Sequence, residues 1–138
     1  MEQIENLDVF PDLIVIMEVT YPFRPTGFLD KAISKILDEG LDSVVPVKHE
    51  HRMTWLKENG KIEIVGEGIM PRQFKRSSLY ISLLGLGCVT RPSLIREGTI
   101  LGDNVGIFEV NDPYSSLELR DNETITYANQ LVLNKYIH

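Results

Sequence analysis

The stretch Leu13–Leu37 constrains the fold more than any other part of this chain. Its first five residues, Leu13–Met17, are all apolar, a run that is too short to cross a membrane and lacks the polar alternation of a half-buried strand. We therefore interpret this run as an interior strand of a sheet that is covered by helices. Pro22 and Pro25 follow and cannot donate to a sheet ladder, so the chain must turn after the strand.

The turn lies at the carboxyl end of the predicted strand. Open α/β sheets bind their ligands at that end of their strands. Thr20, Tyr21 and Arg24 are the polar side chains that the turn presents. We therefore predict a ligand-binding role for this turn.

A helix is predicted next. Apolar residues recur at the spacing of one buried helical face from Leu29 to Leu37, and Gly40 is placed to end the helix in a left-handed conformation. Thr26 is the expected cap at its start. A short apolar run, Ser43–Val47, follows. Strand, helix and strand in this order predict a right-handed crossover between two parallel strands.

The remaining elements are predicted from turn signals and periodicity. Asn59-Gly60 between two extended runs is the signature of a hairpin with a type I′ turn, and Trp55 in that hairpin needs a surface to pack against. We expect one strand over Leu79–Val89, a short helix over Pro92–Glu97, a strand over Val105–Val110 and a final helix from about Asn122 to Tyr136.

Size and composition bound the class of protein. A chain of 138 residues with 43% hydrophobic and 25% charged residues is expected to form one globular domain. Its net charge of -6 disfavours nucleic acid as a partner. Cys88 is the single cysteine, and the N-terminus resembles neither a secretory signal nor an amphipathic transit peptide, so we expect a cytoplasmic protein that does not act at a membrane.

Two short motifs allow a chemical and a structural interpretation. His49-Glu50-His51 could hold a metal ion if it lay on a strand, but no third ligand is visible at a supporting spacing, and we interpret it as a solvated connector. Gly85-Leu-Gly87 resembles half of a dinucleotide-binding fingerprint but lies inside an apolar run. Close backbone packing or a bulge is the favoured interpretation.

A basic cluster is formed by Arg72, Lys75 and Arg76, with Arg24 elsewhere in the chain. Arginine side chains match carboxylate and phosphate oxygens in a two-pronged geometry, so an anionic small molecule is a candidate ligand. A solvated loop is the alternative interpretation of such a charge run.

The order of these features resembles a known family. The segment Val15–Val47, Trp55–Gly60, the triplet Pro71-Arg72-Gln73 and the short helix before Gly98 resemble the central and C-terminal part of the acylneuraminate cytidylyltransferases. The resemblance continues into the last helix. It implies a partial Rossmann-like nucleotidyltransferase sheet of the α/β class, mixed but mostly parallel, that carries a protruding β-hairpin dimerisation arm. We expect a single domain, 1–138, with residues 48–78 as the inserted arm.

Members of that family join a sugar acid to the α-phosphate of CTP with the help of Mg²⁺, and the resemblance implies a role for several residues. Thr20, Tyr21 and Arg24 would lie on the sugar-acid side of the cleft. Arg72 and Gln73 would belong to the arm that reaches the partner subunit of a homodimer. Glu118 would take one of the two metal-binding positions of the family.

The sequence departs from the family's pattern in three places. The glycine-rich nucleotide-binding half has no counterpart in this chain, and Glu18 and Tyr21 replace a glutamine and a serine of the sugar-binding turn. Glu118 and Arg120 replace the two metal-site aspartates, and an arginine repels a cation. The enzyme hypothesis is therefore that this chain is part of a cytidylyltransferase and is inactive alone. The alternative is a non-catalytic module that dimerises or binds a sugar acid or another anion.

Overall fold

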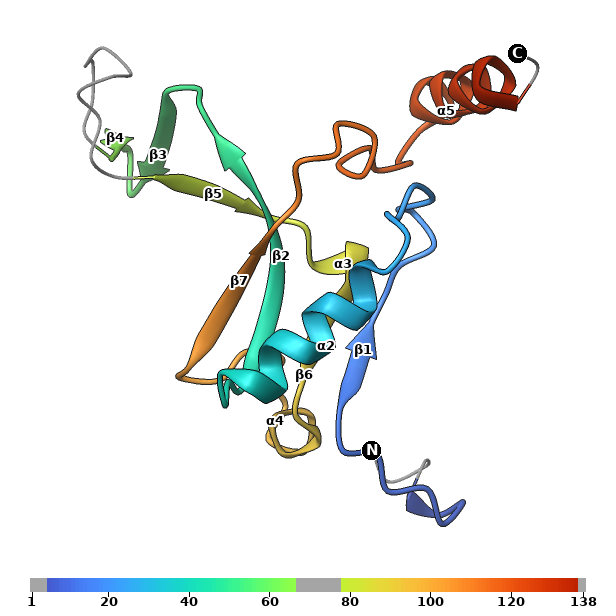
Figure 1. Ribbon diagram of the computed structural model, residues 1–138. Coiled ribbons are helices and arrows are strands. Elements are labelled where there is room, and N and C mark those ends of the chain that lie inside the picture. Colours follow the sequence, from blue (N-terminus) through green and yellow to red (C-terminus); the bar gives the residue numbers. More distant parts are fainter. Residues whose placement is uncertain (1–4, 67–77, 137–138) are drawn as a thin grey trace.

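The computed structural model describes residues 5–66 and 78–136. The described chain has a mixed sheet, a separate β-hairpin and helices of very different lengths (Figure 1). In chain order the elements are β1 (Ile14–Ile16), α2 (Phe28–Asp38), β2 (Ser43–Glu50), β3 (Thr54–Glu58), β4 (Lys61–Val65), β5 (Leu79–Ser82), α3 (Leu84–Gly87), β6 (Cys88–Thr90), α4 (Pro92–Arg96), β7 (Val105–Glu109) and α5 (Asn122–Tyr136).

Strand β2 is the centre of the five-stranded sheet. It pairs in parallel with β7 and antiparallel with β5 and β6, and β6 in turn pairs antiparallel with β1. Strands β1 and β2 therefore run in the same direction, as the predicted crossover requires, but β6 lies between them. The sheet is mixed, as predicted. The prediction of a mostly parallel sheet is wrong for the described strands, because only the pairing of β2 with β7 is parallel.

The predicted strand over Leu79–Val89 is two strands with one helical turn between them. Val47 of β2 pairs with Ser82, whereas Val44, three residues earlier in β2, pairs with Val89, seven residues later in the other strand. Four extra residues are therefore looped out of the ladder, and they are the four residues of α3. The prediction of a bulge at the two glycines is confirmed in this form.

Strand β1 differs from the interior strand that its apolar sequence predicted. Each of its three residues is only half-buried, and within residues 5–66 and 78–136 its second edge has no partner strand. Met17 and Val19, which follow it, are 51% and 95% exposed. The apolar run is therefore an edge strand in the described structure, since no described strand lies beyond it to bury its outer side.

Helix α2 covers the sheet (Figure 1). The face that periodicity predicted is buried only in part, because Leu37, at its end, is 57% exposed. Ala32 and Ile36 are buried against Val44 and Val89 of the sheet. The expected Thr26 cap is absent: Gly27, in the left-handed region at φ 69°, occupies the cap position, and no side chain caps the helix there. Gly40, at φ 62°, ends the helix as predicted.

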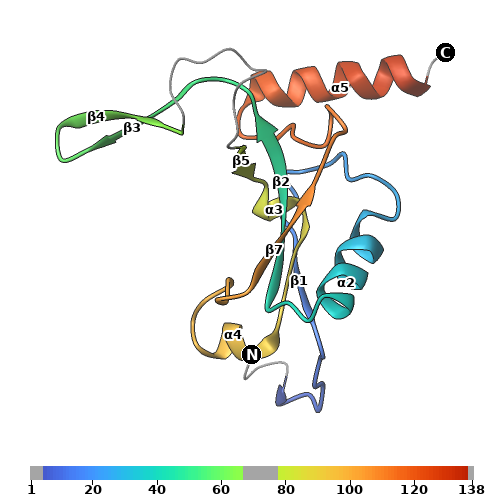
Figure 2. The same ribbon diagram turned by 60° about the vertical axis from the view of Figure 1, so that its left-hand side comes forward.

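The hairpin β3–β4 has the predicted turn and lies outside the main sheet. Asn59 and Gly60 adopt φ values of 49° and 82°, the two positive angles of a type I′ turn. The two strands form a sheet of their own that extends away from the five-stranded sheet (Figure 2). Trp55 and Ile62 remain 55% and 63% exposed, so the described chain supplies no surface that covers them.

The last two helices also follow their sequence signals. Helix α4 begins with Pro92, and Gly98 follows its end at φ 79°. Helix α5 is capped by Asp121, whose Oδ1 accepts a hydrogen bond of 2.7 Å from the Thr124 backbone N–H. It lies apart from α2 and from the hairpin β3–β4 (Figure 1). Among the helices of the described chain, none combines the length and the apolar character needed to cross a membrane.

Candidate functional site

The turn after β1 is held against the backbone of α3 by Arg24. Its Nε donates to the Leu86 carbonyl at 2.7 Å, and its Nη2 donates to the Gly85 carbonyl at 3.0 Å and to the Glu18 carbonyl. The Glu18 backbone N–H also donates to the Gly85 carbonyl at 2.8 Å. One guanidinium thus joins the beginning of the turn to the looped-out residues of the neighbouring strand. We call this contact the Arg24 junction.

The two glycines of α3 make this close approach possible. A Cβ on Gly85 would lie 2.7 Å from the side chain of Glu18 and 2.8 Å from that of Tyr21. A Cβ on Gly87 would lie 2.7 Å from the Leu29 side chain, and Gly87 also has a positive φ of 151°. The prediction of close backbone packing at Gly85-Leu-Gly87 is therefore confirmed.

Tyr21 belongs to the core as well as to the candidate site. Its side chain is 7% exposed and packs in a cluster with Phe28, Leu86 and Val110. Burial raises the pKa of its hydroxyl, and the charge of the Glu118 carboxylate and a hydrogen bond to it raise the pKa further. Tyr21 is therefore neutral at physiological pH, and its hydroxyl serves as a donor toward Glu118.

Glu118 reaches the turn because the backbones of the two segments are joined. The Leu119 N–H donates to the Thr20 carbonyl at 2.8 Å. The Glu118 carboxylate forms an ion pair with Arg120, with 2.8 Å between Oε1 and Nε. The hydrogen bond from Arg120 lowers the pKa of the Glu118 carboxyl, with a smaller contribution from Tyr21. Glu118 is therefore ionised and committed to partners within the chain.

The charge of the site is balanced between acidic and basic groups. The Thr20 hydroxyl donates to the Glu18 carboxylate at 3.1 Å, so this side chain also has a partner within the turn. Glu18 and Glu118 both act on the pKa values of Tyr21 and Arg120, which places the two carboxylates in one neighbourhood. The site presents two carboxylates, two guanidinium groups, a hydroxyl and a phenol.

The structure brings four of the predicted site residues together: Thr20, Tyr21, Arg24 and Glu118. Arg72 and Gln73 lie outside the described residues. Sequence reasoning missed the carbonyl groups of Gly85 and Leu86, which are the partners of Arg24. The paired glycines were the available signal, because they mark a place where another segment approaches the backbone.

The donor set at Glu118 does not fit a magnesium ion. Mg²⁺ requires oxygen ligands in near-octahedral geometry, and the Glu118 carboxylate is instead neutralised by Arg120. Among residues 5–66 and 78–136, no group of three or more potential ligands converges to hold a metal ion. We therefore derive no chemical step that passes through a metal at this position.

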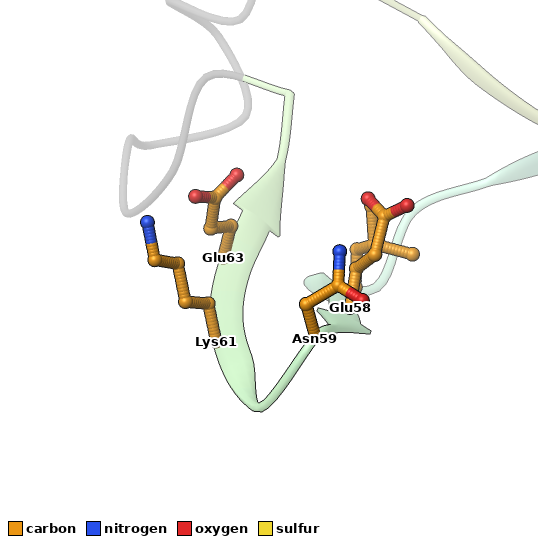
Figure 3. A pocket seen from close by; sticks show the side chains of 5 residues that line it. Glu58, Asn59, Lys61 and Glu63 are labelled. Carbon is orange, nitrogen blue, oxygen red and sulfur yellow. The ribbon is translucent and has the colours of Figure 1, made fainter.

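Two surface hollows lie away from these residues. The first, of about 160 Å³, is lined by Leu56, Glu58, Asn59, Lys61 and Glu63 at the hairpin. In Figure 3, Glu58, Lys61 and Glu63 project from the two strands and Asn59 from the turn between them, and these side chains do not converge on a common point. The second, of about 380 Å³, lies along α5 beside Tyr127. Neither hollow includes Thr20, Tyr21, Arg24 or Glu118.

Comparison with solved structures shows the class of fold. The chain is similar to 4-diphosphocytidyl-2C-methyl-D-erythritol synthase from Anaerococcus prevotii, with a TM-score of 0.62 and 13% identity over 94% of this chain and 64% of that one. It is also similar to 2-C-methyl-D-erythritol 4-phosphate cytidylyltransferase from Thermus thermophilus, with a TM-score of 0.55 and 14% identity over 91% of this chain and 64% of that one. The described chain therefore has a cytidylyltransferase-like α/β fold.

These similarities extend to the fold alone, because the identities are low. The chain spans 64% of the length of each of the two solved structures. A scan of the sequence against models of protein families gives no match, and a search of curated proteins gives none.

Proposed function

We propose that this chain is a cytidylyltransferase-like domain related to the enzymes that activate sialic-acid-type sugars with CTP, and that residues 1–138 do not catalyse the transfer alone. The sequence resemblance supports the relationship to the sugar-acid enzymes, and the fold supports the broader cytidylyltransferase-like class. The sequence resembles the acylneuraminate cytidylyltransferases in the order of its motifs, and the fold is similar to that of two other cytidylyltransferases. The sugar-acid side of the cleft would be the turn that contains Thr20, Tyr21 and Arg24.

Each residue of the turn would have a distinct part in binding a sugar acid. Arg24 uses Nε and Nη2 to hold backbone carbonyls, whereas its Nη1 makes no hydrogen bond to any described residue and can donate to a carboxylate. The Thr20 hydroxyl can exchange its contact with Glu18 for one with a sugar hydroxyl. Tyr21 would form the wall of the site, because its ring is buried. Arg72 and Gln73 would add donors from the arm.

The ion pair between Glu118 and Arg120 is the observation that supports the inactive state of this chain. Transfer of a nucleotidyl group needs positive charge to neutralise the phosphates and the group that leaves. The position that would carry the metal in the family holds a carboxylate that Arg120 has already neutralised. Residues 1–138 therefore offer neither a free metal ligand at this position nor a glycine-rich phosphate loop, and these are the groups that would position CTP.

The same ion pair favours a second candidate function, a non-catalytic module that dimerises and binds a sugar acid or another anion. Such a module would keep the scaffold and the turn but not the reaction. The exposed Trp55 and Ile62 of the hairpin favour a homodimer in either case, since an isolated apolar hairpin face needs a surface to cover it. CTP would be a ligand in the first case only.

Release of pyrophosphate from CTP in the presence of Mg²⁺ and a panel of nonulosonic acids tests the proposal. We expect no release above the level of a reaction without protein. Robust release would overturn the inactive state of residues 1–138. An Arg120→Ala chain belongs in the same assay, because it removes the competing cation while it keeps Glu118.

Binding of the same sugar acids, followed by calorimetry, tests the role of the turn. We expect Thr20→Val to weaken binding. Thr26→Val is the matched control, because Thr26 is exposed on the same segment and makes no hydrogen bond in the described structure. Equal affinities for the two variants, or no binding of any sugar acid or inorganic anion to the unmodified chain, would contradict a ligand site at this turn.

A further inference from the structure

Two histidines meet at the point where the main sheet ends and the hairpin begins. His49 is the penultimate residue of β2, and His51 follows the strand, three residues before β3 starts. The Nδ1 atom of His49 lies 3.2 Å from the Nε2 atom of His51. Their rings are nearly perpendicular, at 86°, with 4.1 Å between centroids. One nitrogen of each ring therefore faces the other.

This separation is close to the one that a shared metal ion requires. Two nitrogen ligands at about 2.0–2.1 Å from a tetrahedral zinc ion lie about 3.3 Å apart. Alternate residues of a strand point to the same side, which explains why a His-x-His sequence at the end of β2 brings its two rings together. In the structure these two nitrogens share a hydrogen bond, so a metal ion would take the place of the shared proton, and that proton would move to the outer nitrogen of its ring.

Neighbouring groups hold the two rings in place without competing for them. Tyr80 of β5 pairs with His49, and their ring centroids lie 5.3 Å apart. Glu50, between the two histidines, is committed to Arg52, with 2.5 Å between Glu50 Oε2 and Arg52 Nη2. The nearby cation of Lys48 is likewise engaged, because its Nζ donates to the Ser116 hydroxyl at 2.9 Å.

We propose that His49 and His51 form a two-histidine chelate for a divalent transition-metal ion. Neutral imidazole suits Zn²⁺, Ni²⁺ and Cu²⁺, and Cu²⁺ is expected to bind most tightly among the three. His49 Nδ1 and His51 Nε2 supply the ligands, each ring keeps its proton on the other nitrogen, and water completes the coordination. Within the described residues no third histidine, cysteine or carboxylate joins them.

The position of the chelate gives it a structural consequence. His49 belongs to the five-stranded sheet, whereas His51 belongs to the connection that leads into the hairpin β3–β4. A metal ion that binds both rings would restrict the backbone between them. It would therefore restrict the direction in which the hairpin leaves the sheet. This inference does not depend on the cytidylyltransferase proposal.

Calorimetric titration of the untagged chain with Zn²⁺, Ni²⁺ and Cu²⁺ tests the chelate. We expect one ion per chain, bound most tightly for Cu²⁺. Replacing either ligand, in His49→Gln or in His51→Gln, should weaken binding at least about tenfold, the size of effect that changes at metal sites commonly have. His138→Gln, which replaces the third histidine of the chain, is the matched control and should bind as the unmodified chain does.

Several outcomes would overturn the proposal. They are the absence of binding to the unmodified chain at millimolar metal, equal weakening in His138→Gln, or a stoichiometry of one ion per two chains. Broadening of backbone amide signals in nuclear magnetic resonance spectra by Cu²⁺ locates the bound ion independently. It should affect His49, His51 and Tyr80 and leave Thr20 and Leu119 unchanged, and the reverse pattern would also contradict the chelate.

Discussion

The Arg24 junction and the hairpin β3–β4 both lie outside the regular ladder of the main sheet, but they differ in whether their groups find partners within the chain. At the junction, carbonyl groups that the looped-out α3 removes from the sheet ladder accept hydrogen bonds from an arginine of the same chain. In the hairpin, the backbone pairs with itself, but Trp55 and Ile62 remain more than half exposed. The first region finds its hydrogen-bond partners within the chain, whereas the second leaves apolar side chains exposed. Stability and assembly should therefore depend on different residues.

The largest difference is expected between two isoleucines. Ile36 of α2 is 0% exposed, so Ile36→Ala should lower the free energy of unfolding by about 2–5 kcal/mol, because it removes buried methyl groups and leaves a cavity. Ile62 of the hairpin is 63% exposed, and Ile62→Ala should change it by less than about 0.5 kcal/mol under monomeric conditions. Urea unfolding measures both. Similar losses would show that the hairpin packs against the chain in solution.

Arg24→Ala should have the next largest effect. It removes the hydrogen bonds from the guanidinium to the carbonyls of Glu18, Gly85 and Leu86, of which the first two keep a backbone N–H donor, and this loss should cost about 2–3 kcal/mol of unfolding free energy. Arg91→Ala is the matched control, because the Arg91 side chain donates to one carbonyl, that of Leu41 at 2.9 Å, and its loss should cost about 1 kcal/mol. An Arg24 variant no less stable than the Arg91 variant would contradict the junction.

Trp55→Ala should affect assembly and leave the fold of the monomer unchanged. If the hairpin is the dimerisation arm, light scattering should give the mass of a dimer for the unmodified chain and a lower mass for the variant. Tyr127→Ala removes an aromatic ring of similar exposure, 52%, from α5 and should leave the mass unchanged. A monomeric mass for the unmodified chain would count against the arm.

The smallest expected effect is a shift in the titration of one phenol. Burial and Glu118 raise the pKa of Tyr21 above 10.0 in the folded chain. The unfolded chain therefore loses this proton first as the pH rises, so the contribution of Tyr21 to stability is present below pH 10 and declines as the pH rises toward the folded value.

Ultraviolet absorbance of tyrosinate follows this titration. Tyr21→Phe should remove the part of the absorbance change that occurs above pH 10. Glu118→Gln should move this part toward lower pH, because the substitution removes the negative charge beside the phenol. A titration curve that Tyr21→Phe does not alter would contradict the burial of this hydroxyl.

Local patterns in the sequence predicted local structure well. Periodicity identified α2 and α5, Asn59-Gly60 identified the hairpin turn, and Gly40 identified the end of α2. These signals act over a few residues, so the surroundings do not change them. Thr26 failed as a cap because Gly27 adopts the left-handed conformation instead and lies one residue nearer the helix.

Features that depend on distant residues were not predictable in the same way. The apolar run at β1 is typical of an interior strand, but whether a strand is interior depends on its neighbours, and in the described chain one edge is unpaired. Likewise, the paired glycines indicate that another segment approaches their backbone, but no pattern reveals that this segment is the turn with Arg24, 61 and 62 residues away. Glu118 and Tyr21 are 97 residues apart in the sequence, and a backbone hydrogen bond from Leu119 to Thr20 joins their segments.

The central proposal, that the ion pair with Arg120 keeps Glu118 from binding a metal ion, can be tested directly with Mn²⁺, a paramagnetic ion that favours the same oxygen ligands as Mg²⁺. Nuclear magnetic resonance would follow the amide signals of Thr20, Tyr21 and Leu119 during the titration. We predict that they keep their linewidths in the unmodified chain and broaden in Arg120→Asp, which adds a second carboxylate. Selective broadening of these amides in the unmodified chain would contradict the account.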